Sequence, residues 1–295
     1  MTILHGMRVF ESSAFVALPL AGMQLAQMGA EVIRFDNLGG GLDHLRRPLA
    51  PNGESLFWQG LNKGKKSFAV NLKSEKGREL VTDLITSDGD DAGLFITNLR
   101  VAGWTDYESL KRKRADLIMV TLKGDRHGGP EVDYTVNPSL GIPHITGAEG
   151  STEPVANALP AWDCVAGNMV VSSLLAAERD RLRTGRGQDV EFALKDAAAA
   201  IIGHLGMIGE ATIYDQQRGK SGNSVYGAYG QDFECACGGR VVVIGLTLRQ
   251  WRGLVKATDK GQEIKSLEKK LNLSLDDEGP VSYTHLTLPT NIGVV

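Results

Sequence analysis

Residues 8–35 read RVFESSAFVALPLAGMQLAQMGAEVIRF, in which two short strand-like runs flank an apolar helical stretch. We expect a strand at 8–10, a helix at 20–28 and a second strand at 31–35, because apolar residues recur there at strand and helix spacing. The alternation continues with a helix at 75–86, a strand at 94–97, a helix at 107–114 and a strand at 117–122. Strands that alternate with helices favour a parallel sheet of Rossmann-like build, so the predicted fold class is α/β.

The second half of the chain predicts a less regular arrangement. Residues 124–160 are rich in glycine and proline, and we expect a long ordered loop that forms a wall of an active site. A long helix is expected at 162–183, where Gly185 and Gly187 end it. The further expected elements are a strand at 189–194, one nearly uniformly apolar helix at 197–210, a hairpin of strands at 232–236 and 240–246, and a helix at 248–257.

Composition shifts divide the chain into three parts. We assign residues 1–220 to a large α/β domain, because Ser221-Gly222-Asn223 has the composition of a hinge. Residues 221–280 are expected to be the start of a smaller α+β domain. Residues 281–295 continue no earlier pattern and resemble translated vector sequence, so we expect a non-native tail.

Charge and cysteine usage exclude several classes of protein. The 295 residues carry 32 Lys+Arg and 35 Asp+Glu, a net charge of -3, which provides no basic face for nucleic acid. Basic residues gather at 46–47, 63–66 and 111–114. Solvated helix faces are the simplest explanation, and we adopt it for residues 111–114 only. Three cysteines in a chain this long argue against a disulfide framework and favour a reducing compartment. Cys235 and Cys237 are too close together for a zinc site, so we expect no bound metal.

Targeting signals and cofactor motifs are also missing from the sequence. The first residues show no secretory signal, and we find no apolar run of membrane-spanning length, so we expect a soluble, cytoplasmic protein. Gly39-Gly40-Gly41 follows the second expected strand and does not link a first strand to its helix. It therefore does not fit a dinucleotide fingerprint, and we expect no NAD.

Asp163 is the candidate catalytic residue. It lies in LPAWDCVAG (residues 159–167), between a tryptophan and a cysteine at the start of the expected long helix. Helix N-termini favour negative charge and offer unpaired N–H groups, so we expect an ionised, nucleophilic aspartate there, with N–H groups and Gly167 available to the reacting group. The residues alone favour the alternative, a plain N-cap aspartate.

Four segments in register resemble the class III CoA-transferase family (CaiB/BaiF type). They are residues 6–11, 19–34, 62–67 and 184–188, and the resemblance covers about residues 3–280. In that family the aspartate before the helix that leads to the Thr-Gly-Arg-Gly-Gln turn accepts the acyl group, and Asp163 matches it. The resemblance further implies interlocked homodimers, and CoA thioesters that enter as substrates, with no permanently bound cofactor.

The same resemblance suggests which residues bind CoA. Asn98 and Lys123 follow neighbouring expected strands and match positions that line the family's CoA groove. Arg34 and Lys65 are further candidates, because guanidinium and ammonium groups bind phosphate well. An ordinary surface charge is the alternative for each of these cations.

Residues 132–138, 159–163, 203–208 and 223–233 resemble one subgroup of the family more closely. Its members move CoA within one molecule, from the carbon-1 carboxyl of mesaconate to the carbon-4 carboxyl. The resemblance implies conversion of 2-methylfumaryl-CoA (mesaconyl-CoA) to 3-methylfumaryl-CoA, while Asp163 holds CoA as an aspartyl thioester. From residue type alone, we expect Tyr134, Asn137 and Tyr226 to orient the free carboxylate of the substrate.

Other functions are left open by the residues. The formyl-CoA type of intermolecular transfer uses a loop glutamine that residues 16–19 lack, and a succinyl-CoA type is a related alternative. Racemisation needs a histidine ahead of the aspartate, which residues 129–134 do not supply. His127, His144 and His204 are most simply loop or core histidines. A different alternative is an inactive truncated fragment, since family members run past this chain, or a simple CoA-binding module.

Overall fold

The computed structural model describes residues 2–215, 217–272 and 274. It forms two units: Met1–Leu140 with Asn157–Gln216, and Gly141–Ala156 with Gln217–Val295. We describe each unit by itself. The domain boundary that we expected at 220 follows the end of the first unit closely, but Gly141–Ala156, which we assigned to the large domain, belongs to the second unit. The expected tail at 281–295 lies outside the described residues.

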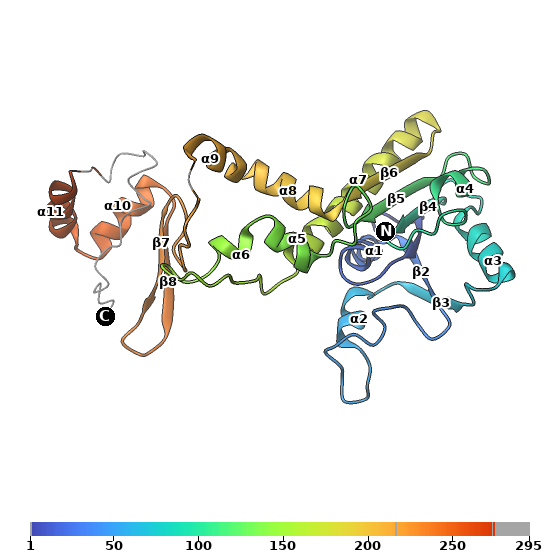
Figure 1. The fold of residues 1–295 in the computed structure, drawn as a ribbon, viewed down its shortest axis with the longest axis horizontal. Helices are drawn as coiled ribbons and strands as arrows, with labels where there is room; N and C mark the ends of the chain where they lie inside the picture. The colour runs from blue at the N-terminus through green and yellow to red at the C-terminus, as the bar shows by residue number, and fades with distance from the viewer. Residues whose placement is uncertain (1, 216, 273, 275–295) are drawn as a thin grey trace. The chain divides into compact units, whose positions relative to one another are not determined.

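The first unit is built on a six-stranded parallel sheet (Figure 1). The strand order is β3-β2-β1-β4-β5-β6, and every neighbouring pair is parallel. The strands are β1 (Arg8–Ser12), β2 (Glu31–Asn37), β3 (Lys66–Val70), β4 (Leu94–Thr97), β5 (Ile118–Lys123) and β6 (Gln188–Ala193). The α/β prediction is confirmed. The direction of winding reverses between β1 and β4, and open α/β sheets bind ligands at the carboxyl ends of such strands.

Helices cover both faces of this sheet, and residues of β1 show which helix lies on which face. Phe10 packs in a buried cluster with residues of α3 (Glu75–Ile85) and α4 (Tyr107–Lys111). Glu11, the next residue, faces α1 (Ala17–Gln27), where a Cβ on Gly22 would overlap its carboxylate. Since side chains alternate across a strand, α1 lies on the face opposite α3 and α4. The long helix α7 (Ala161–Thr184) packs against α1.

Several elements differ from the sequence-based expectation. The segment 124–160 includes two short helices, α5 (Asp133–Ser139) and α6 (Ile142–Ile145). The single apolar helix expected at 197–210 is two helices, α8 (Leu194–His204) and α9 (Met207–Tyr214), bent by 65°. Gly206 separates them with a φ of 78°, a conformation that suits glycine. None of the described residues of α9 is buried, whereas Leu194, Ala197, Ala198 and Ile202 of α8 are.

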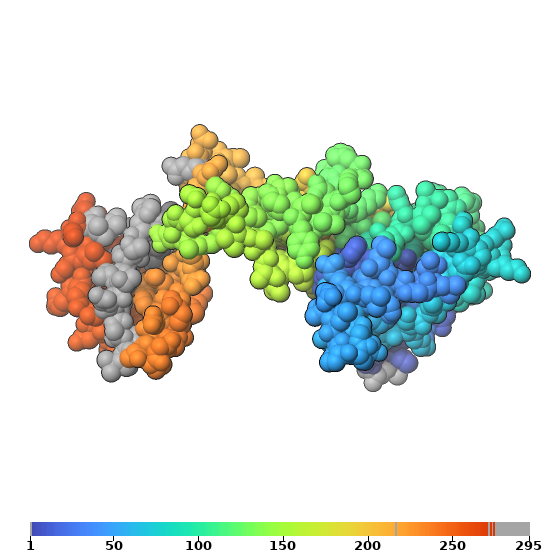
Figure 2. Space-filling view, turned by 60° about the horizontal axis from the view of Figure 1, so that its bottom comes forward, coloured from blue at the N-terminus to red at the C-terminus, as the bar shows by residue number. Residues whose placement is uncertain are grey.

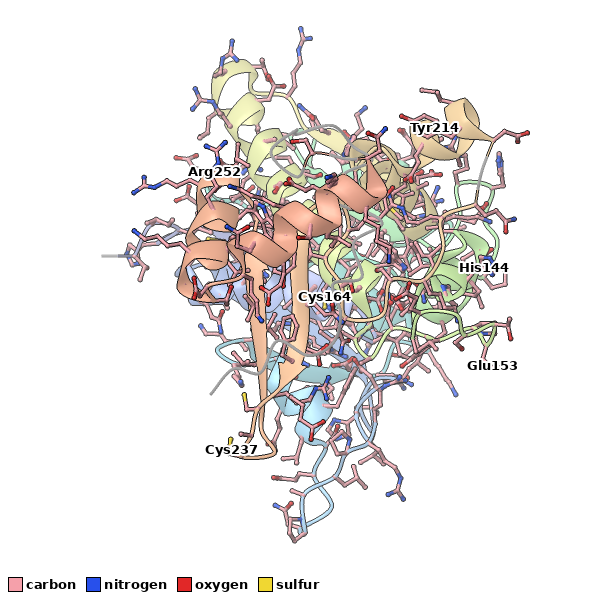
Figure 3. All side chains as sticks on the ribbon, turned by 90° about the vertical axis from the view of Figure 1, so that its left-hand side faces the viewer. His144, Glu153, Cys164, Tyr214, Cys237 and Arg252 are labelled. Atoms are coloured by element: carbon pink, nitrogen blue, oxygen red, sulfur yellow. The ribbon has the colours of Figure 1, made fainter. Side chains whose placement is uncertain are left out.

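The second unit contains a hairpin and two helices. Strand β7 (Tyr229–Glu234) pairs antiparallel with β8 (Arg240–Gly245), and α10 (Leu248–Ala257) and α11 (Gly261–Leu271) follow. Trp251 of α10 packs on Tyr229, with ring centres 4.9 Å apart. Cys237 lies at the tip of the hairpin (Figure 3). No single helix in the described part of the chain is both long and apolar enough to cross a membrane; the bent α8–α9 pair passes that test only by length and composition.

Candidate active site

Asp163 is the third residue of α7 and is half-buried. The helix begins after Pro160, whose side chain has no group that can cap the helix. The cap comes instead from Asp133 in the first turn of α5, thirty residues earlier. Its buried Oδ2 accepts the N–H of Trp162 at 2.8 Å and that of Asp163 at 3.2 Å. Asp163 is therefore not the N-cap of its helix, which removes the structural alternative for this residue.

The remaining N–H groups of the first turn are also engaged. The N–H of Ala161 donates to the carbonyl of Leu159 at 2.8 Å, and that of Cys164 donates to the carbonyl of Pro160 at 3.1 Å. We expected free N–H groups here for an oxyanion, and this expectation was wrong for the structure as it stands. Gly167 likewise does not face a ligand, because its Cα packs on the backbone of Ala17.

The expectation of a readily ionised Asp163 also needs correction. Burial raises the pKa of Asp163 to about 7, the negative charge of Asp133 adds to the increase, and Arg46 opposes it. The helix N-terminus does not lower this pKa enough to compensate, since Asp133 already occupies its N–H groups. Burial also raises the pKa of the neighbouring Cys164 thiol, with Asp163 and Asp133 adding to it. Cys164 is therefore a poor competing nucleophile.

Trp162 forms a fixed wall beside Asp163. Its indole Nε1–H donates to Oδ1 of Asn137 at 2.9 Å, and Nδ2 of Asn157 donates to the same oxygen at 3.1 Å. Asn137 is buried, and its amide oxygen holds the tryptophan in place. Tyr134 is 67% exposed, on the helix that carries Asp133. Tyr226 belongs to the second unit, where the Arg218 guanidinium lies 3.6 Å from its ring centre.

The loop after β1 is held in an unusual conformation at the switch point of the sheet. Asn98, just after β4, donates to the carbonyl of Ala14 and accepts its N–H, both at 3.0 Å. The N–H of Phe15 donates to Oδ2 of Asp43 at 3.0 Å, and Phe15 has a φ of 70°. A bulky residue in this region is strained, and such strain gathers at functional sites. The structure thus gives Asn98 a role in shaping the loop.

Arg46 is the residue near Asp163 that the sequence did not single out. Its guanidinium lies 5.6 Å from the ring centre of Phe15 and 5.0 Å from that of Phe57. The loop that carries it and the following helix α2 (Leu56–Leu61) lie at the surface of the first unit (Figure 2, blue). The sequence left open whether Arg46 is a solvated surface charge. Phe15, whose ring the guanidinium faces, lies two residues before Ala17, and the carbonyl of Ala17 packs against Gly167 of α7. The positive charge of Arg46 opposes the rise in the pKa of Asp163.

Arg34 and Lys65, which we had considered for CoA phosphates, are both buried in one ion cluster. Arg34 is fully buried and donates to Asp36 at 2.9 and 3.2 Å and to Asp43 at 2.8 Å. It also contacts Ser13 and Asn62, lies 3.9 Å from the Glu11 carboxylate, and faces the ring of Trp58. The Lys65 ammonium donates at 2.8 Å to each of three acceptors, which are Glu11, the Pro19 carbonyl and Asn62. An ammonium has three donors, so none is left for a phosphate.

Lys123 is the last residue of β5. Its ammonium pairs with Glu191, and Arg100, which follows β4, pairs with the same carboxylate. Two partly exposed cations thus share one acid at the carboxyl edge of the sheet.

His127, His144 and His204 are all exposed, which corrects our placement of His204 in the core. Cys164 is half-buried in the first unit and Cys237 is exposed (Figure 3). Within the described ranges, no group of three or more His, Cys, Asp or Glu is arranged to hold a metal ion.

Comparisons with known proteins agree with this geometry. Residues 4–276 match the sequence model of CoA-transferase family III. The chain is 56% identical over 278 residues to 2-methylfumaryl-CoA isomerase of Chloroflexus aurantiacus, covering 94% of this chain and 68% of that protein. It is 26% identical over 283 residues to succinyl-CoA:mesaconate CoA-transferase of Haloarcula marismortui, covering 88% and 68%. A solved CaiB/BaiF family protein from Brucella suis matches with a TM-score of 0.75 at 26% identity, covering 90% of this chain and 71% of that one.

Proposed function

We propose that this chain, which belongs to CoA-transferase family III, uses the carboxylate of Asp163 to move coenzyme A between carboxyl groups. The family match confirms the resemblance that the sequence segments indicated. The observation that supports Asp163 most directly is its setting, half-buried in the first turn of α7 while another residue caps that helix. A carboxylate that plays no capping role, and whose pKa is raised to about 7, fits a reacting group.

The proposed reaction proceeds in balanced steps. A carboxylate oxygen of Asp163 attacks the thioester carbonyl and expels the CoA thiolate, leaving a mixed anhydride. The thiolate attacks the Asp163 carbonyl and expels the acid as a carboxylate, so CoA is held as an aspartyl thioester. A carboxylate of the acid then attacks that thioester and expels the thiolate again. The thiolate attacks the new acyl carbonyl and releases Asp163, with no net proton or electron consumed.

The setting of Asp163 suits an intermediate that water would destroy. A mixed anhydride hydrolyses readily, so the site must limit access of water. Trp162 is buried beside Asp163 and is fixed by Asn137, which gives one apolar wall. Only the ionised carboxylate attacks, so we expect the rate to rise with pH through the region around 7.

We further propose that the transfer is intramolecular, converting 2-methylfumaryl-CoA to 3-methylfumaryl-CoA. The support is the 56% identity to a protein named 2-methylfumaryl-CoA isomerase. In this case the dicarboxylic acid stays bound while Asp163 holds CoA. The relative of Haloarcula marismortui, which is named for transfer between succinyl-CoA and mesaconate, represents the intermolecular alternative.

An isotope experiment separates the two. The chain is incubated with unlabelled 2-methylfumaryl-CoA and an excess of carbon-13-labelled free mesaconate, and the two CoA esters are resolved by chromatography and mass spectrometry. Intramolecular transfer predicts 3-methylfumaryl-CoA without label. Product that carries label at the fraction present in the free acid would show intermolecular transfer, and absence of any isomer would contradict the proposal.

We also propose that the protein is a cytoplasmic homodimer. Its three cysteines are free, which fits a reducing compartment. Large apolar side chains on and beside α9 are exposed, including Leu205, Ile208 and Ile213. Exposed apolar surface of this kind marks association sites. Size-exclusion chromatography with light scattering should give twice the chain mass of 31.7 kDa, and a monomer or polydisperse aggregate would contradict the dimer.

A further inference from the structure

We propose that Arg46 anchors the free carboxylate of the dicarboxylic acid while its other carboxyl group reacts at Asp163. This inference rests on the proposed function and adds a binding residue to it. Arg46 would hold the acid during the interval in which CoA is attached to Asp163, so that the acid does not leave before CoA returns to it.

The first support is the unusual setting of the Arg46 guanidinium. It is half-buried and lies near the rings of Phe15 and Phe57, at 5.6 and 5.0 Å from their centres. In the part of the chain that the structure describes, it has no ion pair or side-chain hydrogen bond. Buried and half-buried cations are normally paired with an acid. A guanidinium held by aromatic rings, with its N–H donors unused, is ready for an anionic ligand.

The backbone of Arg46 is fixed on both sides. Its N–H donates to the carbonyl of Asp43 at 3.0 Å, and its own carbonyl accepts the hydroxyl of Ser55. The Asp43 carboxylate also accepts the N–H of Phe15 and binds Arg34. The loop that carries Arg46 is therefore tied to the ion cluster beneath it. A loop whose backbone is already fixed loses less conformational entropy when it binds a ligand.

Packing of the first unit brings Arg46 to the same end of the sheet as Asp163. Gly167 lies one helical turn after Asp163, and a Cβ there would stand 2.7 Å from the carbonyl oxygen of Ala17. Ala17 begins α1, two residues after Phe15, whose ring lies beside Arg46. The first turns of α7, the start of α1 and the Arg46 loop thus meet in one region. The influence of Arg46 on the pKa of Asp163 agrees with this path.

Charge balance explains why a cation is needed there. Asp133 and Asp163 already place two carboxyl groups at the start of α7. A second carboxylate on the substrate would be repelled unless a positive group received it. A guanidinium can bind either carboxylate of mesaconate in the same two-pronged geometry. It can therefore hold the carbon-4 carboxylate before transfer and the carbon-1 carboxylate after it.

The other candidates for this role fit less well. Arg34 and Lys65 have their donors engaged in the buried cluster. Asn137 is neutral and buried, and its amide oxygen is held by Trp162 and Asn157. Tyr134 is neutral and largely exposed. Among these residues, Arg46 alone combines a positive charge, a fixed backbone and unused donors.

The test measures how often the acid escapes during transfer. Four proteins are compared: wild type, Arg46→Met, Arg46→Gln and Arg47→Met. The last is the control, because Arg47 is the exposed cation next to Arg46. Each protein is incubated with 2-methylfumaryl-CoA and labelled free mesaconate. The readout is the ratio of label incorporation to isomerisation. We expect a ratio near zero for wild type and Arg47→Met, and at least a tenfold higher ratio for both neutral Arg46 variants.

The possible outcomes distinguish failure of the proposed role of Arg46 from failure of the proposed CoA transfer. If wild type isomerises without exchange and a folded neutral Arg46 variant does so with an equally low ratio, the anchor is overturned and the proposed function stands. If wild type fails to isomerise, the proposed function fails. Circular dichroism shows which variants are folded. Arg46→Gln keeps a polar planar group near the rings, so it provides a second neutral variant if Arg46→Met is destabilised.

Discussion

At the start of α7, Asp133 and Asp163 compete for one positive helix end. The Asp133 carboxylate accepts the N–H groups of Trp162 and Asp163, and the Asp163 carboxylate accepts neither of them. The result is a carboxyl group that is costly to ionise until a substrate or a cation compensates it. The ionised form of Asp163 is the nucleophile, but its charge lowers the stability of the folded protein.

The first prediction concerns stability of the Asp163→Asn variant. The folded protein keeps the Asp163 proton up to about pH 7, whereas the ordinary value is 3.8, so the unfolded chain binds fewer protons between these values. Stability therefore falls as pH rises through this window. Asparagine removes the penalty, and we expect the variant to be more stable at pH 8 by on the order of 2 to 4 kcal/mol. The advantage should vanish near pH 4.

Urea unfolding at pH 4, 6 and 8 checks this. Asp83→Asn serves as the control, since Asp83 is exposed and pairs with the exposed Lys113. A stability difference between Asp163→Asn and wild type that stays constant across the three pH values would contradict a raised pKa at this residue.

The second prediction separates the charge of Asp133 from its capping role. In Asp133→Asn the amide oxygen still accepts the N–H groups of Trp162 and Asp163, but the charge that helps to raise the pKa of Asp163 is gone. We expect the acidic limb of the kcat/KM profile to move to lower pH while the fold is retained. Glu131→Gln is the control. A profile that does not move, from a folded Asp133→Asn protein, would show that the charge is unimportant.

At the scale of elements, α7 and α1 approach so closely that one glycine decides their contact. A Cβ on Gly167 would lie 2.7 Å from the carbonyl oxygen of Ala17, which is backbone and cannot rotate away. We expect Gly167→Ala to lower stability by about 1 to 3 kcal/mol and to lower activity, because α1 carries the Phe15 loop. The exposed Gly253 in α10 has open space, so Gly253→Ala should be neutral or stabilising by about 0.5 to 1 kcal/mol.

Chemical unfolding and steady-state kinetics on both variants test this contact. Equal stability of the Gly167 and Gly253 variants would mean that the helices can separate without cost, and the close packing of α1 on α7 would then not position the site.

The elements also show what a sequence can predict. Strand β4 was predicted at its observed bounds, since four consecutive buried residues mark a strand covered on both faces. Strand β3 was missed because it is an edge strand whose residues are mostly exposed, which gives no strong apolar pattern. The break between α8 and α9 was missed because the apolar run continues through Gly206.

The site was predictable only where its signal is local. Asp163 stands out within its own segment, and the family resemblance points to it. The residue that caps α7, Asp133, lies thirty residues before Asp163. Capping motifs in a sequence involve only residues a few positions apart, so they do not indicate Asp133. Arg46 resembled a surface charge because its two aromatic contacts come from separate segments. Arg34 and Lys65 suggested phosphate binding because the acids that bind them are assembled only by the fold.

At the scale of the first unit, a buried ion cluster joins β1, β2 and the loops that shape the site. Lys65 binds Glu11 inside this cluster, whereas its neighbour Lys66 binds Glu31 at the surface. Lys65→Met removes the cation nearest to the buried Glu11 carboxylate and leaves it only the more distant Arg34, at 3.9 Å. We expect a loss of about 3 to 5 kcal/mol. Lys66→Met should cost about 1 kcal/mol or less. Thermal and urea unfolding of the two variants provide the comparison, and equal losses would contradict a structural role for the cluster.

The central claim is that CoA transfer passes through a covalent bond to Asp163. The direct test is peptide mass spectrometry after incubation with 2-methylfumaryl-CoA and trapping with hydroxylamine or borohydride, with Asp163→Asn treated in parallel. The account predicts a substrate-dependent mass change confined to the peptide that contains Asp163, and none in the variant. A protein that isomerises its substrate while this peptide stays unmodified, or that is modified at another residue, would contradict it.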